Sequence, residues 1–440
     1  MNKDLMIRRS CKQAVLWLIL AASSITGCKA DKTDITTLDG KFMCGYQGWF
    51  RTPDDGSNMG WVHYRGIYDE FKPGKCGIEF WPDVSELDEK DRVKTPFRHK
   101  DGSPAYVFSS HNPNVVDLHF KWMKEYGIDG AFLQRFACDV TTCHHEYEQL
   151  FPSNNNMLNY VRAAANHHGR SYALMYDLSS IPKGWMDNVK NDWKYLRDEL
   201  KLLNDPKDNF YQEHNGKPIV GIWGVGFNDN REYTLNEVEE FMDFLKNDPN
   251  YGGCSIILGV PTYWRTLDRD TVSDKDLLRI IKKADVVMPW TIGRYRSIAD
   301  VKDYYKNTLI DDVKWSTENR VDFLPVVFPG FSWRNLKPIG EFSKEVHEAY
   351  IPRLKGKFLW TQSTLAKKAG VKMIYQAMFD ELDEGTQIFK VTNDPPLGGG
   401  SEFRTHDEGL PNDFYLKLAG KIRKMLRGEI PPSEEIPAIK

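Results

Sequence analysis

Apolar residues along the chain alternate between short strand-like runs and longer stretches with the spacing of amphipathic helices. Eight runs of five to nine residues are rich in apolar and β-branched side chains, and each is followed by a stretch in which apolar residues recur every three or four positions. The strand-like runs are Phe42–Phe50, Ile128–Phe136, Ser171–Asp177, Pro218–Gly224, Cys254–Val260, Val286–Trp290, Phe323–Phe328 and Lys372–Phe379. The helix-like stretches lie near residues 114–126, 156–168, 185–203, 235–247, 274–283, 298–309, 341–369 and 413–427.

Eight strand–helix units predict an α/β fold, a (β/α)8 barrel that forms one domain over residues 40–430. The first helix is delayed by residues 51–112, which predicts a long insertion after the first strand, with strand candidates at Gly77–Trp81 and Ala105–Ser109. A doubly wound open sheet is the alternative. That fold requires a glycine-rich phosphate loop after the first strand, and Gly45-Tyr46-Gln47-Gly48 does not supply one.

The first 27 residues are typical of a lipoprotein signal peptide. A basic segment precedes the short apolar stretch Ala14–Leu20, and Ile25-Thr26-Gly27 leads into Cys28. The apolar stretch is shorter than the roughly 18 residues that span a bilayer. We therefore expect cleavage before Cys28, lipidation of Cys28, a tether over residues 28–39, and a lipid-anchored protein of the cell envelope, periplasmic or at the outer-membrane surface. An ordinary secretory signal is the alternative.

The net charge and the cysteine content limit which ligands the protein is expected to bind. The chain carries a net charge of −3, and removal of residues 1–27, which carry +3, leaves −6 without any basic run. This balance argues against nucleic-acid binding.

Five cysteines remain beyond Cys28, so at least one thiol is unpaired. Cys138-x4-Cys143-His144-His145 lacks a second ligand pair at zinc spacing, so a local disulfide or two unreactive thiols is expected, with no metal and no cofactor.

Aromatic and polar residues gather where the predicted strands end. In a (β/α)8 barrel these carboxyl ends form the active-site face. Aromatic faces stack on sugar C–H surfaces, and amides, arginines and carboxylates bind hydroxyls, so a carbohydrate is the expected substrate. Any one of these aromatic residues is more often a packing residue, and the argument rests on their shared position. The predicted binding residues are Tyr46, Trp49, Gln134, Arg135, Asp177, Tyr263, Trp264, Trp290 and Trp333, with His63 from the inserted segment.

An acidic cluster follows the last predicted strand. Phe379-Asp380-Glu381-Leu382-Asp383-Glu384-Gly385-Thr386 places four carboxylates within five residues. Crowded carboxylates can hold one group protonated while its neighbour is ionised, which is what cleavage of a glycosidic bond requires. A solvated acidic turn is the plainer interpretation, but the position at a barrel strand end favours catalysis.

Three segments of the chain resemble glycoside hydrolase family 99 and its family 71/99-like relatives. They are Gly45-Tyr46-Gln47-Gly48-Trp49-Phe50, Tyr126-Gly127-Ile128-Asp129-Gly130-Ala131-Phe132, and the acidic cluster. The resemblance implies a (β/α)8 endo-α-mannosidase-like enzyme. It implies Glu381 as the base that deprotonates the sugar 2-hydroxyl, giving a 1,2-anhydro intermediate with net retention. It implies Glu384 as the acid/base.

The acidic cluster also departs from the family signature Trp-Asn-Glu-Trp-His-Glu-Gly-Thr. Phe379-Asp380 and Leu382-Asp383 replace the family's Trp-Asn and Trp-His pairs. We expect Asp380 and Asp383 to contact the substrate, and we expect another α-linked glycan rather than mannan. A non-catalytic surface glycan-binding lipoprotein is the alternative function. An esterase or amidase on the same fold would require a nucleophile elbow or a histidine-rich metal site, and neither is evident.

Overall fold

The computed structural model describes residues 32–407 and 409–439 of the 440-residue chain. The predicted signal peptide, Cys28 and the first part of the predicted tether lie outside these residues. Residues 33–440 form one compact unit. No helix within the described residues is long and apolar enough to cross a membrane.

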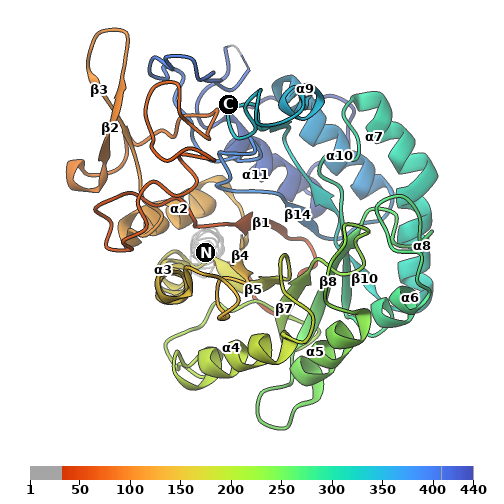
Figure 1. Ribbon diagram of the computed structural model, residues 1–440. Helices are drawn as coiled ribbons and strands as arrows, with labels where there is room; N and C mark the ends of the chain where they lie inside the picture. The colour runs from red at the N-terminus through yellow and green to blue at the C-terminus, as the bar shows by residue number, and fades with distance from the viewer. Residues whose placement is uncertain (1–31, 408, 440) are drawn as a thin grey trace, which may run out of the picture. The chain divides into compact units, whose positions relative to one another are not determined.

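Eight parallel strand positions form the barrel, which helices surround (Figure 1). The barrel strands are β1 (Phe42–Tyr46), β4 (Gly130–Phe136), β5 (Ser171–Asp177), β7 (Lys217–Trp223), β8 (Ser255–Pro261), β9 (Val286–Trp290), the pair β10 (Asp322–Phe323) and β11 (Val326–Val327), and β14 (Ile374–Gln376). The helices between them are α2 (Pro113–Tyr126), α3 (Tyr147–His168), α4 (Met186–Asp198), α5 (Leu235–Asn247), α6 (Asp276–Ile281), α7 (Ile298–Tyr304), the π-helix η2 (Tyr305–Leu309), α8 (Ile310–Asn319), α10 (Lys357–Lys368) and α11 (Phe414–Leu426).

The broken seventh strand closes the barrel. The sheet order is β10-β9-β8-β7-β5-β4-β1-β14-β11, so its two ends are the two halves of one strand. The hydrogen bonds continue through the break, because Leu324 N donates to Val287 O (2.9 Å) and Tyr375 N donates to Pro325 O (3.0 Å). Proline has no N–H to donate, which accounts for the interruption at residue 325. The (β/α)8 prediction is confirmed, and the open-sheet alternative is wrong.

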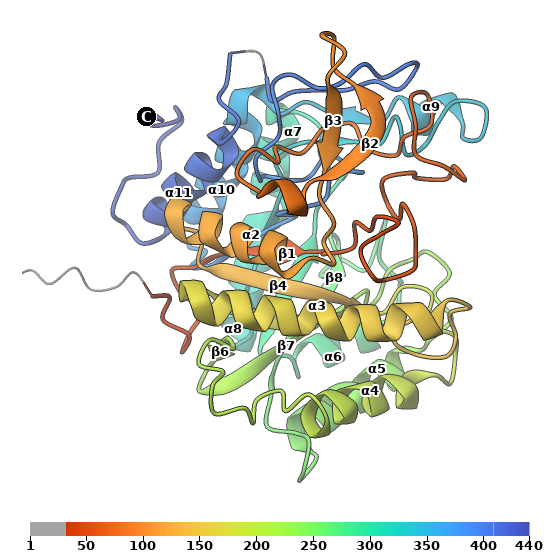
Figure 2. The ribbon, with the colours of Figure 1, turned by 90° about the vertical axis from the view of Figure 1, so that its left-hand side faces the viewer.

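The segment between β1 and α2 carries its own structure. It contains the short 3-10 helix η1 (Glu89–Asp91) and the antiparallel hairpin of β2 (Val93–Arg98) and β3 (Pro104–Val107), which stands away from the ring of barrel strands in both ribbon views (Figures 1 and 2). β3 overlaps the strand candidate Ala105–Ser109, whereas Gly77–Trp81 forms no strand.

Two predicted segments differ in the structure. The helix expected over residues 341–369 is divided into α9 (Lys344–His347) and α10, with β13 (Tyr350–Ile351), which pairs with β12 (Phe331–Ser332), and the short helix η3 (Leu354–Gly356) between them. Pro352, which cannot donate within a helix, stands at the division. The tether expected up to residue 39 is partly packed, since Leu38 is buried and its N–H donates to His214 Nδ1 (3.2 Å). His214 precedes β7 in the small strand β6 (Glu213–His214).

Candidate active site

The acidic loop after β14 is fixed to the end of β1 by Asp380. The Asp380 carboxylate accepts hydrogen bonds from the N–H groups of Gln47 and Gly48, each at 2.8 Å, and the side chain is fully buried. Burial raises the pKa of Asp380 to about 7, and the two backbone donors oppose this rise. Asp380 therefore joins the first and last barrel strands and has no surface with which to contact a substrate, contrary to the sequence prediction.

Glu381 follows Asp380 and is held by two donors. Gln47 Nε2 donates to Glu381 Oε1 (2.9 Å), and the Thr386 hydroxyl donates to Oε2. Burial, with the nearby carboxylates of Glu384 and Asp383, raises the pKa of Glu381 well above its usual range, while its two donors act in the opposite direction. A carboxylate with a raised pKa is a strong base once ionised, and the fixed donors orient it.

Glu384 lies closer to solvent and lines a cavity. Its carboxyl accepts no hydrogen bond from residues 32–407 or 409–439 in the structure, in contrast to that of Glu381. Burial and then the Asp383 carboxylate raise the pKa of Glu384 to about 7, and Lys337 opposes the rise. The two glutamates are thus in different environments. Glu384 lines the cavity and retains its proton up to near neutral pH, whereas the pKa of the more deeply buried Glu381 is raised further because it also faces the charge of Glu384.

The segment between β1 and α2 contributes a histidine to the loop. His63 Nδ1 lies 2.8 Å from Asp383 Oδ2, and the His63 ring stacks on Trp49 with the centroids 3.8 Å apart. His63 has a φ of +63°, unusual for a residue with a Cβ atom. Asp383, Trp49 and His63 thus form one contact chain from the acidic loop to the segment between β1 and α2. The sequence placed these three residues in one site, and the structure brings them together.

The segment is anchored by a buried carboxylate. Glu79 accepts hydrogen bonds from Ser332 Oγ (2.7 Å), Arg404 Nε (2.7 Å) and the N–H of Arg334. Ser332 N donates to Glu384 O (2.9 Å), so this contact also supports the backbone of the acidic loop.

A cavity of about 370 Å³ opens at Glu384. Its walls are largely aromatic, and the rings of Trp223 and Trp290 meet edge to face with centroids 5.2 Å apart. The volume lies in the range of small-molecule sites, and aromatic walls with a few polar groups suit a sugar ring. The other lining residues are Phe227, Asp229, Arg231, Ile292, Gly293, Arg294, Arg296, Phe331, Trp333, Ala349, Tyr350 and Ile351.

Several predicted binding residues lie elsewhere. Tyr46 is buried and bonds His119 through its hydroxyl (2.8 Å), and Trp264 is buried against Trp315 (4.7 Å between centroids). Arg135 forms a buried pair with Asp192 at 2.6 Å on the helix side of its strand. Tyr46 and Arg135 leave the barrel wall toward the surrounding helices, because successive strand residues point to opposite faces, whereas Trp264 lies in the turn after β8. The prediction of substrate contact is wrong for all three.

The remaining predicted residues, Gln134, Asp177 and Tyr263, do not line this cavity. Gln134 is buried and donates to the Tyr375 hydroxyl (2.8 Å). Asp177, at the end of β5, is buried with a pKa that burial raises to about 6. Tyr263 lines a second cavity, of about 340 Å³, whose lining shares Arg294 with the first.

Sequence reasoning missed part of the cavity wall. Arg231 and Arg294 come from loops beyond strand ends, and Tyr350 comes from a segment expected to be helical. The positions of Arg231 and Arg294, eight residues after the end of β7 and four after the end of β9, are the signal that could have identified them. Cys138 and Cys143, in the loop after β4, are thiols with their sulfur atoms 2.8 Å apart.

The fold is similar to that of solved glycoside hydrolases. No protein-family model matches the sequence, and no curated protein matches it. The structure resembles that of the GH99 endo-alpha-mannosidase from Bacteroides thetaiotaomicron with a TM-score of 0.61 and 15% identity, over 89% of this chain and 99% of that one. The same enzyme in complex with bis-tris-propane gives a TM-score of 0.59 at 15% identity, with the same coverage. A glycoside hydrolase-like protein gives 0.52 at 12%, over 90% of this chain and 97% of that one. At these identities the comparison establishes a shared barrel fold.

Proposed function

We propose that this protein is a retaining glycoside hydrolase that acts on an α-linked polysaccharide or oligosaccharide through Glu381 and Glu384. The observation that carries the proposal is the different environment of two neighbouring glutamates at one strand end. Glu381 is buried and oriented by two donors, whereas Glu384 lines an aromatic cavity with a pKa of about 7. The shared fold with a GH99 endo-alpha-mannosidase supports the same class of activity.

The resemblance of the acidic cluster to family 99 suggests the order of proton transfers. Glu381 takes the proton of the sugar 2-hydroxyl, and the resulting oxygen attacks C1 while Glu384 protonates the departing glycosidic oxygen. Glu384 then removes a proton from the water that opens the 1,2-anhydro ring at C1, and Glu381 returns its proton to O2. Two inversions at C1 give net retention, and both glutamates finish in their starting states.

The glutamate assignments can be tested by substitution. Glu384→Gln should lower turnover of a natural glycan by about 10²–10⁴-fold, because the leaving alkoxide then departs without a proton. An aryl glycoside with an activated phenolic leaving group should suffer much less. Glu381→Gln should be severe on both substrates. Glu402→Gln, which makes the same chemical change outside the cavity, serves as the control.

A screen of α-linked polysaccharides should identify the substrate. NMR of the first-formed product should then show its anomeric configuration. Product of inverted configuration would overturn the retaining mechanism. Near-normal turnover by both variants would move the chemistry away from these residues. Binding of a glycan without cleavage would favour the alternative, a surface glycan-binding lipoprotein.

We also propose that Cys28 is lipidated and anchors the protein in the cell envelope. The proposal rests on the basic and apolar segments that precede Ile25-Thr26-Gly27-Cys28. Cys28→Ser should release the protein from the membrane fraction. Unchanged membrane association of that variant would contradict the lipoprotein assignment.

A further inference from the structure

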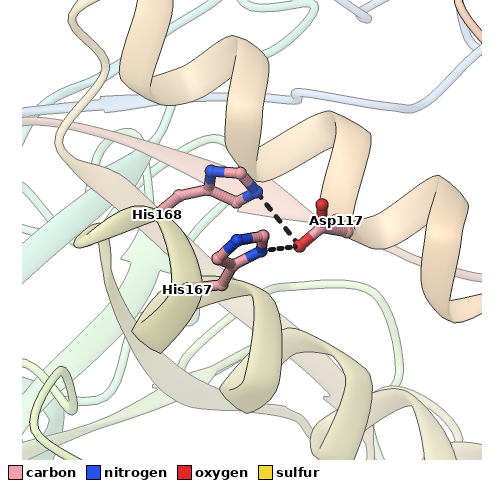
Figure 3. A group of neighbouring side chains, drawn as sticks. All are labelled: Asp117, His167 and His168. Carbon is pink, nitrogen blue, oxygen red and sulfur yellow. Dashed lines mark hydrogen bonds and ion pairs between the residues drawn. The ribbon is translucent and has the colours of Figure 1, made fainter.

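Three side chains with metal-binding atoms converge between α2 and α3, outside the active-site cavity. Asp117 comes from α2, and His167 and His168 are the last two residues of α3 (Figure 3). His167 Nδ1 lies 2.7 Å and His168 Nε2 lies 3.0 Å from the same oxygen, Asp117 Oδ1. All three potential ligand atoms lie within 4.8 Å of one another. Two consecutive helices thus direct three donors to one point.

The buried histidine lacks an ordinary hydrogen bond at this point. His168 Nε2 is shielded from solvent and has no hydrogen-bond partner among the described residues, although Asp117 Oδ1 is only 3.0 Å away. The distance of 3.0 Å is short enough for a hydrogen bond, so it is the angle between the imidazole ring and the carboxylate oxygen that does not allow one. A buried imidazole nitrogen without a partner costs free energy. Asp117 Oδ1 already bonds His167 Nδ1 (2.7 Å), so the unmet hydrogen bond is that of His168 Nε2, and a cation beside this nitrogen and the carboxylate would replace it.

We propose that Asp117, His167 and His168 bind a divalent transition-metal cation, with Zn²⁺ as the best match. Ligand atoms at about 2.0–2.2 Å from a tetrahedral zinc ion are about 3.3–3.6 Å apart. The two nitrogen–oxygen separations, 2.7 and 3.0 Å, therefore need to open by roughly half an ångström, and the two nitrogens, which lie within 4.8 Å of each other, need to settle at a similar separation. Two imidazoles with one carboxylate favour zinc over magnesium or calcium, which prefer oxygen ligands.

The surroundings agree with a cation that has one open coordination position. The His167 side chain is 69% exposed and that of Asp117 39% exposed, so water reaches the site as a fourth ligand. The two histidines lie at the C-terminal end of α3, where the helix dipole favours positive charge. This end of α3 leads directly into the start of β5, at the opposite end of the strands from the acidic loop. The metal therefore links α2 to α3 and takes no part in the glycosidase chemistry.

Zinc titration of the mature chain, free of a histidine tag and treated with chelator, tests the site. Isothermal titration calorimetry should give one Zn²⁺ per chain, and Mg²⁺ should give no comparable signal. A saturating excess of about 100 times the dissociation constant should raise the Tm by roughly 3 °C. Co²⁺ should give the intense visible absorption of tetrahedral coordination. Binding should weaken as the pH falls, because the ligands must be deprotonated.

Variants decide between this site and adventitious binding. His167→Ala removes an exposed side chain and should weaken zinc binding by at least about tenfold without unfolding the protein, and Asp117→Asn should do the same. His145→Ala, from the stacked pair His144–His145, is the matched control and should bind zinc normally. The proposal is overturned if the parent chain takes up no zinc, or if its uptake and Tm rise persist unchanged in His167→Ala.

Discussion

Replacing Asp383 by asparagine should shift the pH dependence of activity through Glu384, the proposed acid catalyst. Burial and the Asp383 carboxylate together raise the pKa of Glu384 from 4.5 to about 7. Asparagine has nearly the same shape, and its side-chain oxygen can still accept a hydrogen bond from His63 Nδ1, which lies 2.8 Å from Asp383 Oδ2. The substitution therefore removes a like charge while the contact with the histidine can remain.

The size of the expected shift follows from how far the pKa of Glu384 is raised and from the order of the causes of that rise. Burial is the larger cause, so the Asp383 charge accounts for the smaller share, roughly one pKa unit. Glu384 must be protonated to donate to the leaving oxygen, so activity is lost as the pH rises through its pKa. The alkaline limb of kcat/KM should move from near pH 7 to near pH 6, which makes the variant about tenfold slower than the parent at pH 8.

The assay is a pH profile of kcat/KM on a natural glycan, with an activated aryl glycoside in parallel. The aryl substrate needs little protonation, so its alkaline limb should depend far less on Glu384. Asp229→Asn is the control, because Asp229 lines the same cavity but is not a cause of the raised pKa of Glu384. An alkaline limb that remains in place, or moves to higher pH, in Asp383→Asn would refute the reasoning.

Three further substitutions probe the site and its support. Trp290→Ala should raise KM about tenfold with a smaller effect on kcat, measured by steady-state kinetics, because it removes one aromatic wall of the cavity. Glu384→Gln should raise stability by up to about 3 kcal/mol at pH 8 and leave it unchanged at pH 4, measured by denaturant unfolding, because the raised carboxyl pKa penalises the folded state only once the group ionises. Gly45→Ala should destabilise the barrel by about 1–3 kcal/mol in the same assay, because its Cβ would lie 2.0 Å from Met378 Sδ and 2.2 Å from the Tyr375 hydroxyl oxygen.

The strands were predictable because each buries a continuous apolar run. All eight strand positions follow from such runs, and even the broken seventh strand lies inside its expected range of 323–328, apart from Asp322. The division of the expected helix 341–369 was harder to predict, since Pro352 and Gly356 were its local signs and the pairing of β12 with β13 is a tertiary contact.

The site was predictable in position more than in orientation. Glu381 and Glu384 follow the end of the last barrel strand, and the position of that end can be predicted from the spacing of apolar residues in the sequence. Whether a side chain near such an end faces the cavity or the helices depends on the register of the strand, and a shift of one residue reverses it. That is why Trp290, the last residue of β9, lines the cavity, while Arg135 in β4 points to the helices and pairs with Asp192.

The hydrogen bonds from Gln47 and Gly48 to Asp380 make the proposed catalytic site depend on residues from both ends of the barrel domain. Gln47, which orients Glu381, leaves the ribosome more than 300 residues before it, and Asp380 meets the backbone of Gln47 and Gly48 only when β14 docks beside β1. A nascent or truncated polypeptide that lacks its last barrel strand consequently has neither an oriented base nor a closed ring. Orientation of Glu381 and closure of the barrel thus both depend on contacts between the two ends of the barrel domain.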